Sequence, residues 1–108
     1  MKVIKRDGRE VDFDRNKIIS AIGKANSESH INHEKTLSDD EIKNIATRIY
    51  DKLRRSKRIY SVEDIQDLIE EYIDKYGCFS LVKRYTLYRY KQSLIRKKNT
   101  TDDAILSL

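Results

Sequence analysis

The scarcity of helix-breaking residues constrains the fold of this chain more than any other feature. The 108 residues include no proline and only three glycines, Gly8, Gly23 and Gly77. Proline and glycine interrupt helices more strongly than any other residues, so a chain with so few of them favours long helices. A chain of this length has room for one domain with one modest core.

Four segments have the apolar spacing of amphipathic helices. Asp14 can cap a first helix that runs to about residue 27, and the polar stretch "SESHINHEKT" then reads as a loop. In "LSDDEIKNIATRIYDKLRRSK", Ser38 and Glu41 have the spacing of a capping box, which predicts a second helix. Ser61 can cap a third helix, and Gly77 is placed to end it.

The fourth segment, from about Phe79 to Lys97, differs from the other three in its pattern. Apolar and aromatic residues nearly encircle it between residues 85 and 90. A helix that is apolar on most sides touches several neighbours. We therefore expect this helix to be the most buried of the four.

The first residues, "KVIKRDGREVDF", predict a β-hairpin. Asp7-Gly8 between two short apolar runs is the signal of a two-residue turn, which would pair Arg6 with Arg9 and Ile4 with Val11. The run at residues 59–60 fits one more short strand. Such a hairpin is too small to be stable alone. The chain thus reads as mainly α: a four-helix bundle capped by a small N-terminal β-hairpin of two or three strands.

Charge and cysteine content narrow the class of protein. The net charge of +5 indicates either an anionic partner or merely a soluble basic surface. Cys78 is the only cysteine, which excludes an internal disulfide and fits a reducing compartment. No apolar run has the length of a membrane span, and the N-terminus has no signal-peptide pattern. We expect a cytoplasmic protein without a membrane partner.

No catalytic or metal-binding constellation is recognisable. The chain has no Ser/His/Asp signature, glycine-rich phosphate loop or metal-binding helix motif. His30, His33 and Glu34 lie close in sequence, but further metal ligands are not evident. The acidic stretch of residues 63–71 reads most simply as the solvated face of the third helix. We expect neither catalytic residues nor a resident metal.

The cations at the hairpin tip suggest a site for a polyphosphate. Such a ligand needs several donors that converge from different elements. Lys5 and Arg6 lie at the tip, and Lys17 lies one turn into the first helix. Arg89 lies on the last helix, where a buried guanidinium needs an anionic partner. One tension follows, because regular strand alternation sends Lys5 and Arg6 to opposite faces.

An adenine base would need an apolar slot next to these cations. Val3, Phe13 and Ile18 are near enough in sequence to form one. The residues alone do not decide between this interpretation and a solvated turn.

Three separated motifs, "VIKRDGREVDFDRNKI", "SVEDIQDLIEEY" and "YTLYRYK", resemble the ATP-cone domain over about residues 2–93. This family provides the allosteric nucleotide-binding domain at the N-terminus of many ribonucleotide reductases. It also occurs behind a zinc ribbon in a bacterial repressor of the reductase genes. The resemblance implies a domain over residues 1–93 that binds ATP or dATP with Mg²⁺ between the cap and the helices.

The resemblance also implies which residues bind the nucleotide. Those on the signature are Val3, Lys5, Arg6, Asp7 and Gly8. Those on the following strand and the helices are Phe13, Lys17, Ile18, Ser61 and Arg89. Gln66 is an alternative to Ser61, and the contact to the sugar stays open between Glu10 and Asp14.

The tail "NTTDDAILSL" is similar to the stretch that enters the catalytic domain of the anaerobic (class III) ribonucleoside-triphosphate reductases. Residues 94–108 would then be the end of the last helix and a linker toward that catalytic domain. The implied function is allosteric control of ribonucleotide reductase. Its partners would be the adenine nucleotide, the catalytic domain and further copies of the chain.

Three alternatives differ from this function. The first is a basic helical nucleic-acid-binding domain, prompted by the net charge, the "RRSKR" cluster and seven tyrosines. The tyrosines lie largely on helix stripes, which favours core positions over exposed stacking platforms and makes nucleic acid a disfavoured partner. The second is the ATP-cone of a transcriptional regulator. The third is a dimerisation module that binds no nucleotide.

Overall fold

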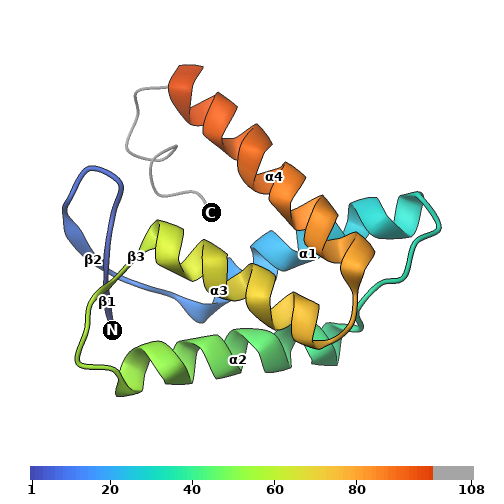
Figure 1. Ribbon diagram of the computed structural model, residues 1–108. Helices are drawn as coiled ribbons and strands as arrows, with labels where there is room; N and C mark the ends of the chain where they lie inside the picture. The colour runs from blue at the N-terminus through green and yellow to red at the C-terminus, as the bar shows by residue number, and fades with distance from the viewer. Residues whose placement is uncertain (99–108) are drawn as a thin grey trace.

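The computed structural model describes residues 1–98, which form four helices and a three-stranded sheet (Figure 1). The strands are β1 (Lys2–Ile4), β2 (Glu10–Asp12) and β3 (Tyr60–Ser61). The helices are α1 (Arg15–Ile31), α2 (Asp39–Arg55), α3 (Val62–Lys75) and α4 (Phe79–Lys98). This confirms the predicted helical bundle with a small N-terminal cap. The tail "NTTDDAILSL" lies outside the described residues.

The sheet has the strand order β2-β1-β3. β1 pairs antiparallel with β2 and parallel with β3, so the third strand, predicted at residues 59–60, forms at Tyr60–Ser61. The predicted register of the hairpin was wrong by one residue, because Ile4 pairs with Glu10 and Val3 with Val11. As a result, Arg6 and Arg9 are not cross-strand partners.

The turn explains this shift in register. The amide of Lys5 donates to the carbonyl of Arg9 at 2.8 Å, and the amide of Gly8 donates to the carbonyl of Lys5 at 2.9 Å. The loop therefore has three residues, and Gly8 has a φ of +91°, which favours glycine. Asp-Gly also suits this three-residue loop, in which a tight turn is followed by a left-handed residue.

The caps of α2 and α3 lie where the sequence predicts them. Ser38 and Glu41 form a reciprocal capping box at the start of α2. Ser61 and Asp64 form the same box at the start of α3. Each box satisfies two backbone amides that the helix itself leaves unpaired, which fixes where the helix begins.

α1 is one turn longer than predicted, because it continues to Ile31 through part of the expected loop. Ser29, in the expected loop, is buried. The chain beyond the helix is tied back to it, since the side-chain amide of Asn26 donates to the carbonyl of Leu37 at 2.9 Å and accepts from its amide at 2.8 Å. These tertiary contacts explain why the polar composition of the segment was misleading.

The core lies between the four helices and under the sheet. Its fully buried members include Ile22, Ile45, Ile65 and Leu81, one from each helix. Val3 of β1 joins the same cluster, so the sheet is attached to the bundle by its apolar face. Burial of this kind contributes about 25 cal/mol per Å² of apolar surface. The cap therefore takes its stability from the bundle.

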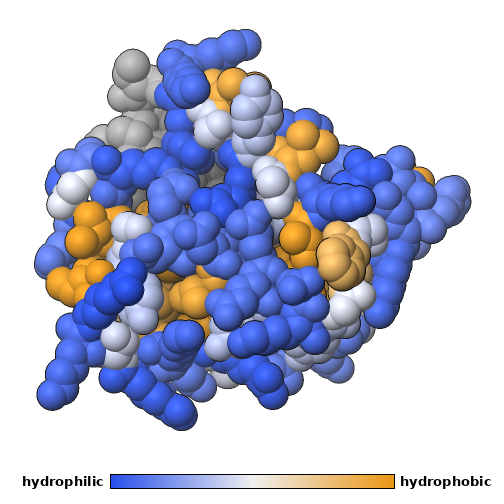
Figure 2. All heavy atoms as spheres, viewed as in Figure 1, coloured by the Kyte–Doolittle hydropathy of each residue, from blue (hydrophilic) through white to orange (hydrophobic). Residues whose placement is uncertain are grey.

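The prediction that α4 is the most buried helix was wrong. Only Leu81 and Tyr85 of this helix are buried, and both lie in its first half. Its second half extends past the other helices (Figure 1), and hydrophobic residues show at the surface there (Figure 2). The exposed apolar side chains of α4 are Phe79, Leu87, Tyr90, Leu94 and Ile95. With 20 residues α4 is the longest described helix, and among residues 1–98 its second half extends beyond the other helices (Figure 1).

Candidate functional site

Lys5 turns inward from the end of β1. Its side chain lies on the same face as Val3, and the residue is only 4% exposed. In the described part of the chain its ammonium has one ionic partner, Asp7, at 3.7 Å. This is beyond hydrogen-bonding distance, and burying a charge is costly unless it is paired and hydrogen-bonded. Lys5 is therefore an ammonium that a bound anion would stabilise.

Asp7 shapes the hairpin loop. Its carboxylate accepts from the backbone amide of Arg9 at 3.1 Å and from Nε of Arg9 at 2.8 Å. The backbone hydrogen bond is the largest cause of a lowered pKa at Asp7, ahead of the opposing effect of desolvation. Asp7 thus holds the loop that presents Lys5 and Arg6.

Arg6 and Arg89 meet at one carboxylate, although 82 positions separate them in the sequence. Nε of Arg6 donates to Oε1 of Glu63 at 2.8 Å. A terminal nitrogen of Arg89 donates to Oε2 of Glu63 at 2.9 Å. The hairpin loop and α4 therefore bring two guanidinium groups to the first turn of α3. Two arginines on opposite sides of a carboxylate define a position where an anion is held.

Two more carboxylates of α3 hold Arg89 from the other side. One terminal nitrogen of Arg89 lies 3.0 Å from Asp67 and 2.5 Å from Glu70. Burial alone would lower the pKa of Arg89, but the hydrogen bonds and charges of these carboxylates raise it above the usual value. The hydroxyl of Thr86 also donates to Glu70 at 2.6 Å. Arg89 is therefore fixed in place before any ligand arrives.

Glu63 is ionised in this arrangement. Desolvation would raise its pKa, but the hydrogen bond from Arg89 and the charge of Arg6 outweigh it and lower the pKa. The interpretation of residues 63–71 as a solvated face holds for the exposed Glu63 and Asp67, but it missed that these two and the partly buried Glu70 bind Arg89. Their i, i+4, i+7 spacing, which places them on one face of α3, was the signal that could have identified them.

A cavity of about 280 Å³ opens beside this cluster, between α3 and α4. It is lined by Glu63, Gln66, Glu70, Thr86, Arg89, Tyr90, Ser93 and Arg96. Pockets for small molecules usually measure about 300–1,000 Å³. This cavity is thus near the lower limit, with room for a phosphate chain but little more.

Gln66 and Tyr85 form a polar pair under the cavity. Both are buried, and the Tyr85 hydroxyl donates to the side-chain oxygen of Gln66. Burial raises the pKa of Tyr85 far above its usual value, so the phenol stays protonated. This neutral, buried pair joins α3 to α4. The sequence predicted Gln66 only as an alternative to Ser61.

The remaining predicted residues lie apart from this cluster. Val3, Phe13 and Ile18 are packed in the core, so the predicted adenine slot is closed in this structure. Lys17 is exposed on α1 and makes no ion pair within residues 1–98. The Ser61 hydroxyl accepts from the amide of Asp64 at 3.1 Å as the cap of α3. The structure thus brings together Arg6 and Arg89 but leaves the base-binding role of the apolar residues a prediction.

No group of three or more His, Cys, Asp or Glu side chains in residues 1–98 is arranged to hold a metal ion. No helix within them combines the length and the apolar character that crossing a membrane requires.

Comparisons with known proteins agree with the motifs. Residues 1–94 match the family model of the ATP cone domain. The chain is also 35% identical over 116 aligned residues to the vitamin B12-dependent ribonucleoside-diphosphate reductase of Thermoplasma acidophilum. This alignment covers 99% of the chain but only 14% of the reductase. The chain is therefore similar to one small part of a much longer enzyme.

Proposed function

This chain belongs to the ATP-cone domain family, and on that premise we propose that it is an allosteric domain that binds ATP or dATP and controls a ribonucleotide reductase. The observation that carries the proposal is the meeting of Arg6 and Arg89 at one carboxylate, with the buried Lys5 next to Arg6 in the hairpin sequence. Three cations from two distant elements are the donor set that a triphosphate requires.

The bound triphosphate would replace the carboxylate of Glu63 between the two guanidinium groups. Mg²⁺ bound to the phosphates would offset their repulsion by Glu63, Asp67 and Glu70, which stay nearby. The apolar residues at the base of the cap, Val3 and Ile18, would contact the adenine once the hairpin moves outward. The closed adenine slot fits this proposal, because an unliganded apolar slot is expected to collapse.

Regulation then depends on the difference between two similar ligands. ATP and dATP differ by one hydroxyl group, so the switch must use a contact or a packing change near the ribose. Each nucleotide shifts the equilibrium between an active and an inactive enzyme only by its differential affinity for the two states. The part that moves is the cap or the helices relative to the catalytic domain or another copy of the chain.

The class of ribonucleotide reductase to which this domain would be attached is proposed on separate grounds. The tail supports an anaerobic ribonucleoside-triphosphate reductase, whereas the curated relative is a vitamin B12-dependent diphosphate reductase. We keep the anaerobic class as a prediction that rests on the tail alone. The proposed domain ends near residue 93, although α4 continues to Lys98 without a break. The domain itself would carry no catalytic residue and would act in the cytoplasm.

The arrangement of tyrosines gives no support to the nucleic-acid alternative. Tyr85 is buried, and among the described tyrosines only Tyr90 has a highly exposed side chain, at 60%. Stacking platforms for bases need exposed rings. The helix-stripe interpretation of the tyrosines is thus largely confirmed.

Titration calorimetry with ATP, dATP and GTP tests the proposal. We expect both adenine nucleotides to bind, and Lys5→Ala or Arg89→Ala to weaken binding at least tenfold, about 1.4 kcal/mol. Arg55→Ala is the matched control, because it removes one cation on α2 and should leave the affinity unchanged. Binding that survives both site substitutions would mean that the nucleotide lies elsewhere, and failure of adenine nucleotides to bind at all would reject the function.

A further inference from the structure

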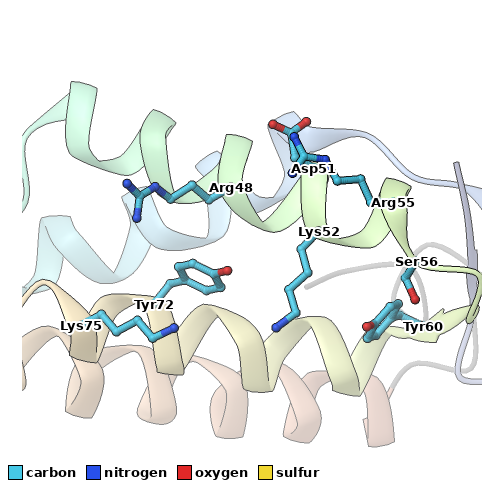
Figure 3. A pocket seen from close by; sticks show the side chains of 8 residues that line it. All are labelled: Arg48, Asp51, Lys52, Arg55, Ser56, Tyr60, Tyr72 and Lys75. Carbon is cyan, nitrogen blue, oxygen red and sulfur yellow. The ribbon is translucent and has the colours of Figure 1, made fainter.

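A second basic surface lies between α2 and α3 and includes part of the "RRSKR" cluster. A groove of about 710 Å³ runs between these helices and β3 (Figure 3). Its α2 wall carries Arg48, Lys52 and Arg55, which we call the α2 cations. Its other wall carries Tyr72 and Lys75 of α3, with Tyr60 of β3 at one end. This groove shares no lining residue with the cavity beside Arg89.

The α2 cations lack the carboxylate partners that other arginines of this chain have. None of them makes an ion pair or a side-chain hydrogen bond within residues 1–98. Arg54 on the same helix does pair with Asp51, at 3.4 Å. Like charges at i and i+4 on a helix repel each other slightly, and Asp51, which lies near Arg48 and Lys52 in sequence, offsets this repulsion only in part because its carboxylate pairs with Arg54.

The spacing of the α2 cations suits a linear row of anions. They lie at positions i, i+4 and i+7, on one side of α2, and span roughly 10 Å at about 1.5 Å per residue. Lys52 reaches from α2 toward α3, between the rings of Tyr72 and Tyr60 (Figure 3). A compact phosphate would need donors that converge on one point. Charges that follow a helix instead match carboxylates on successive turns of a second helix.

The tyrosine rings argue against a nucleic acid in this groove. The Arg58 guanidinium covers the Tyr60 ring at 4.5 Å from its centroid, and the Lys75 ammonium covers the Tyr72 ring at 4.7 Å. Both rings also pack against the core. A base would therefore find no free ring face on which to stack, and stacking contributes much of the affinity for single strands.

Carboxylates at the edges of the groove also argue against a nucleic acid. Asp51 lines the groove itself, and an adjoining cavity that shares Lys52 and Tyr60 also carries Asp64, Asp67 and Glu71. The continuous phosphates of a nucleic acid would meet these carboxylates and be repelled. A protein segment with acidic residues on one edge and a basic residue on the other would complement both signs.

We propose that the α2–α3 groove is a docking site for an acidic helical segment of a partner protein. Carboxylates one turn apart on that segment would pair with the α2 cations. The groove lies close along the chain to the cluster of Arg6, Arg89 and Glu63, which we call the candidate anion site. Tyr60 lines the groove, and Glu63 follows three residues later and binds both arginines. A shift of the first turn of α3 would therefore change the geometry of both the groove and the candidate anion site.

A peptide titration tests the docking site without any nucleotide, so its result is independent of the proposed function. The probe is a fluorescein-labelled, alanine-rich helical peptide with glutamates at i, i+4 and i+7, measured by fluorescence anisotropy at about 0.1 M salt. The groove variant is Arg48→Ala/Lys52→Ala/Arg55→Ala. The control variant, Lys43→Ala/Lys83→Ala/Lys91→Ala, loses the same charge from exposed residues elsewhere.

We expect the groove variant to lose at least tenfold in peptide affinity and the control variant less than threefold. Amide shifts of the ¹⁵N-labelled chain should change mainly over residues 48–60 and 68–75, and thermal unfolding should show that both variants stay folded. Equal losses of peptide affinity in the two variants would show that the effect comes from net charge alone, and they would reject the docking site. So would the absence of peptide binding, or tighter binding of a single-stranded oligothymidylate that depends on the same three cations.

Discussion

The two basic regions of this molecule differ in how their charge is balanced. At the candidate anion site, Arg6 and Arg89 are held by carboxylates of α3, and Arg89 alone has three of them within 3.0 Å. In the α2–α3 groove, the α2 cations have no such partner among residues 1–98. The first arrangement stabilises the fold, and under the proposed function a ligand has to displace a carboxylate there. The second leaves part of the repulsion between cations uncompensated, which under the proposed docking a partner would relieve.

Removal of Arg89 tests the stabilising half of this comparison and should have the largest effect. We expect Arg89→Ala to lower the free energy of unfolding by about 1.5 kcal/mol, because hydrogen bonds to charged groups contribute about 1.5–3 kcal/mol each in favourable settings. The value is near the lower limit because the side chains of Glu63 and Asp67 are 53% and 72% exposed and therefore screened. Urea denaturation measures the change.

Removal of the Glu63 charge tests whether a ligand competes with the carboxylate. We expect Glu63→Gln to raise the affinity for ATP about fivefold, near 1 kcal/mol, because the amide keeps the shape of the side chain but no longer holds both guanidinium groups as an anion. Calorimetry measures the affinity, and Asp51→Asn in the groove is the control that should change nothing. Weaker binding by Glu63→Gln would show that this carboxylate assists the ligand.

The sequence predicted the helices of this fold better than it predicted the candidate site. Ser38, Ser61 and Gly77 are local signals, and each marks the helix end that the structure shows. The hairpin register was missed because Asp-Gly suits both a two-residue and a three-residue loop, and only the packing of Val3 together with its partner Val11 against the core distinguishes them.

The acidic face of α3 was missed for a different reason. Carboxylates at i, i+4 and i+7 look the same whether they face water or an arginine from another helix. The neighbour, Arg89, lies on α4, and its partners depend on how α3 and α4 pack. Other tertiary contacts, the burial of Ser29 and the hydrogen bonds between Asn26 and Leu37, explain why α1 continues through the polar start of the expected loop. Long-range contacts of this kind leave no local pattern in a single sequence.

The pH dependence of stability tests where the carboxyl groups with lowered pKa values lie. The backbone amide of Ser61 is the largest cause of a lowered pKa at Asp64, and arginines lower that of Glu63 against the effect of burial. A carboxyl group whose pKa is lower in the folded than in the unfolded chain stabilises the fold at pH values above its unfolded pKa, which is about 4. This stabilisation is lost as the pH falls through the folded pKa.

We therefore expect the melting temperature to fall as the pH drops below about 4, more steeply in the wild type than in Asp64→Asn. The difference should be at most about 4 °C, since 1 kcal/mol corresponds to about 4–8 °C in a domain of this size. Calorimetric scans across this range measure it. The triple substitution of the α2 cations should leave the slope unchanged, and a changed slope would place shifted carboxylates in the groove.

Removal of a cation from the groove should have the smallest effect, and its sign should be opposite to that of Arg89. Arg48 lies within α2, away from the last turn where the helix dipole favours positive charge, and one turn before Lys52. We expect Arg48→Gln to raise the free energy of unfolding by about 0.2–0.5 kcal/mol at low salt, because it relieves this i, i+4 repulsion. The gain should vanish near 1 M salt, where the screening length is about 3 Å. Urea denaturation at both salt concentrations measures it, and a loss of stability at low salt would mean that Arg48 has a partner within the fold.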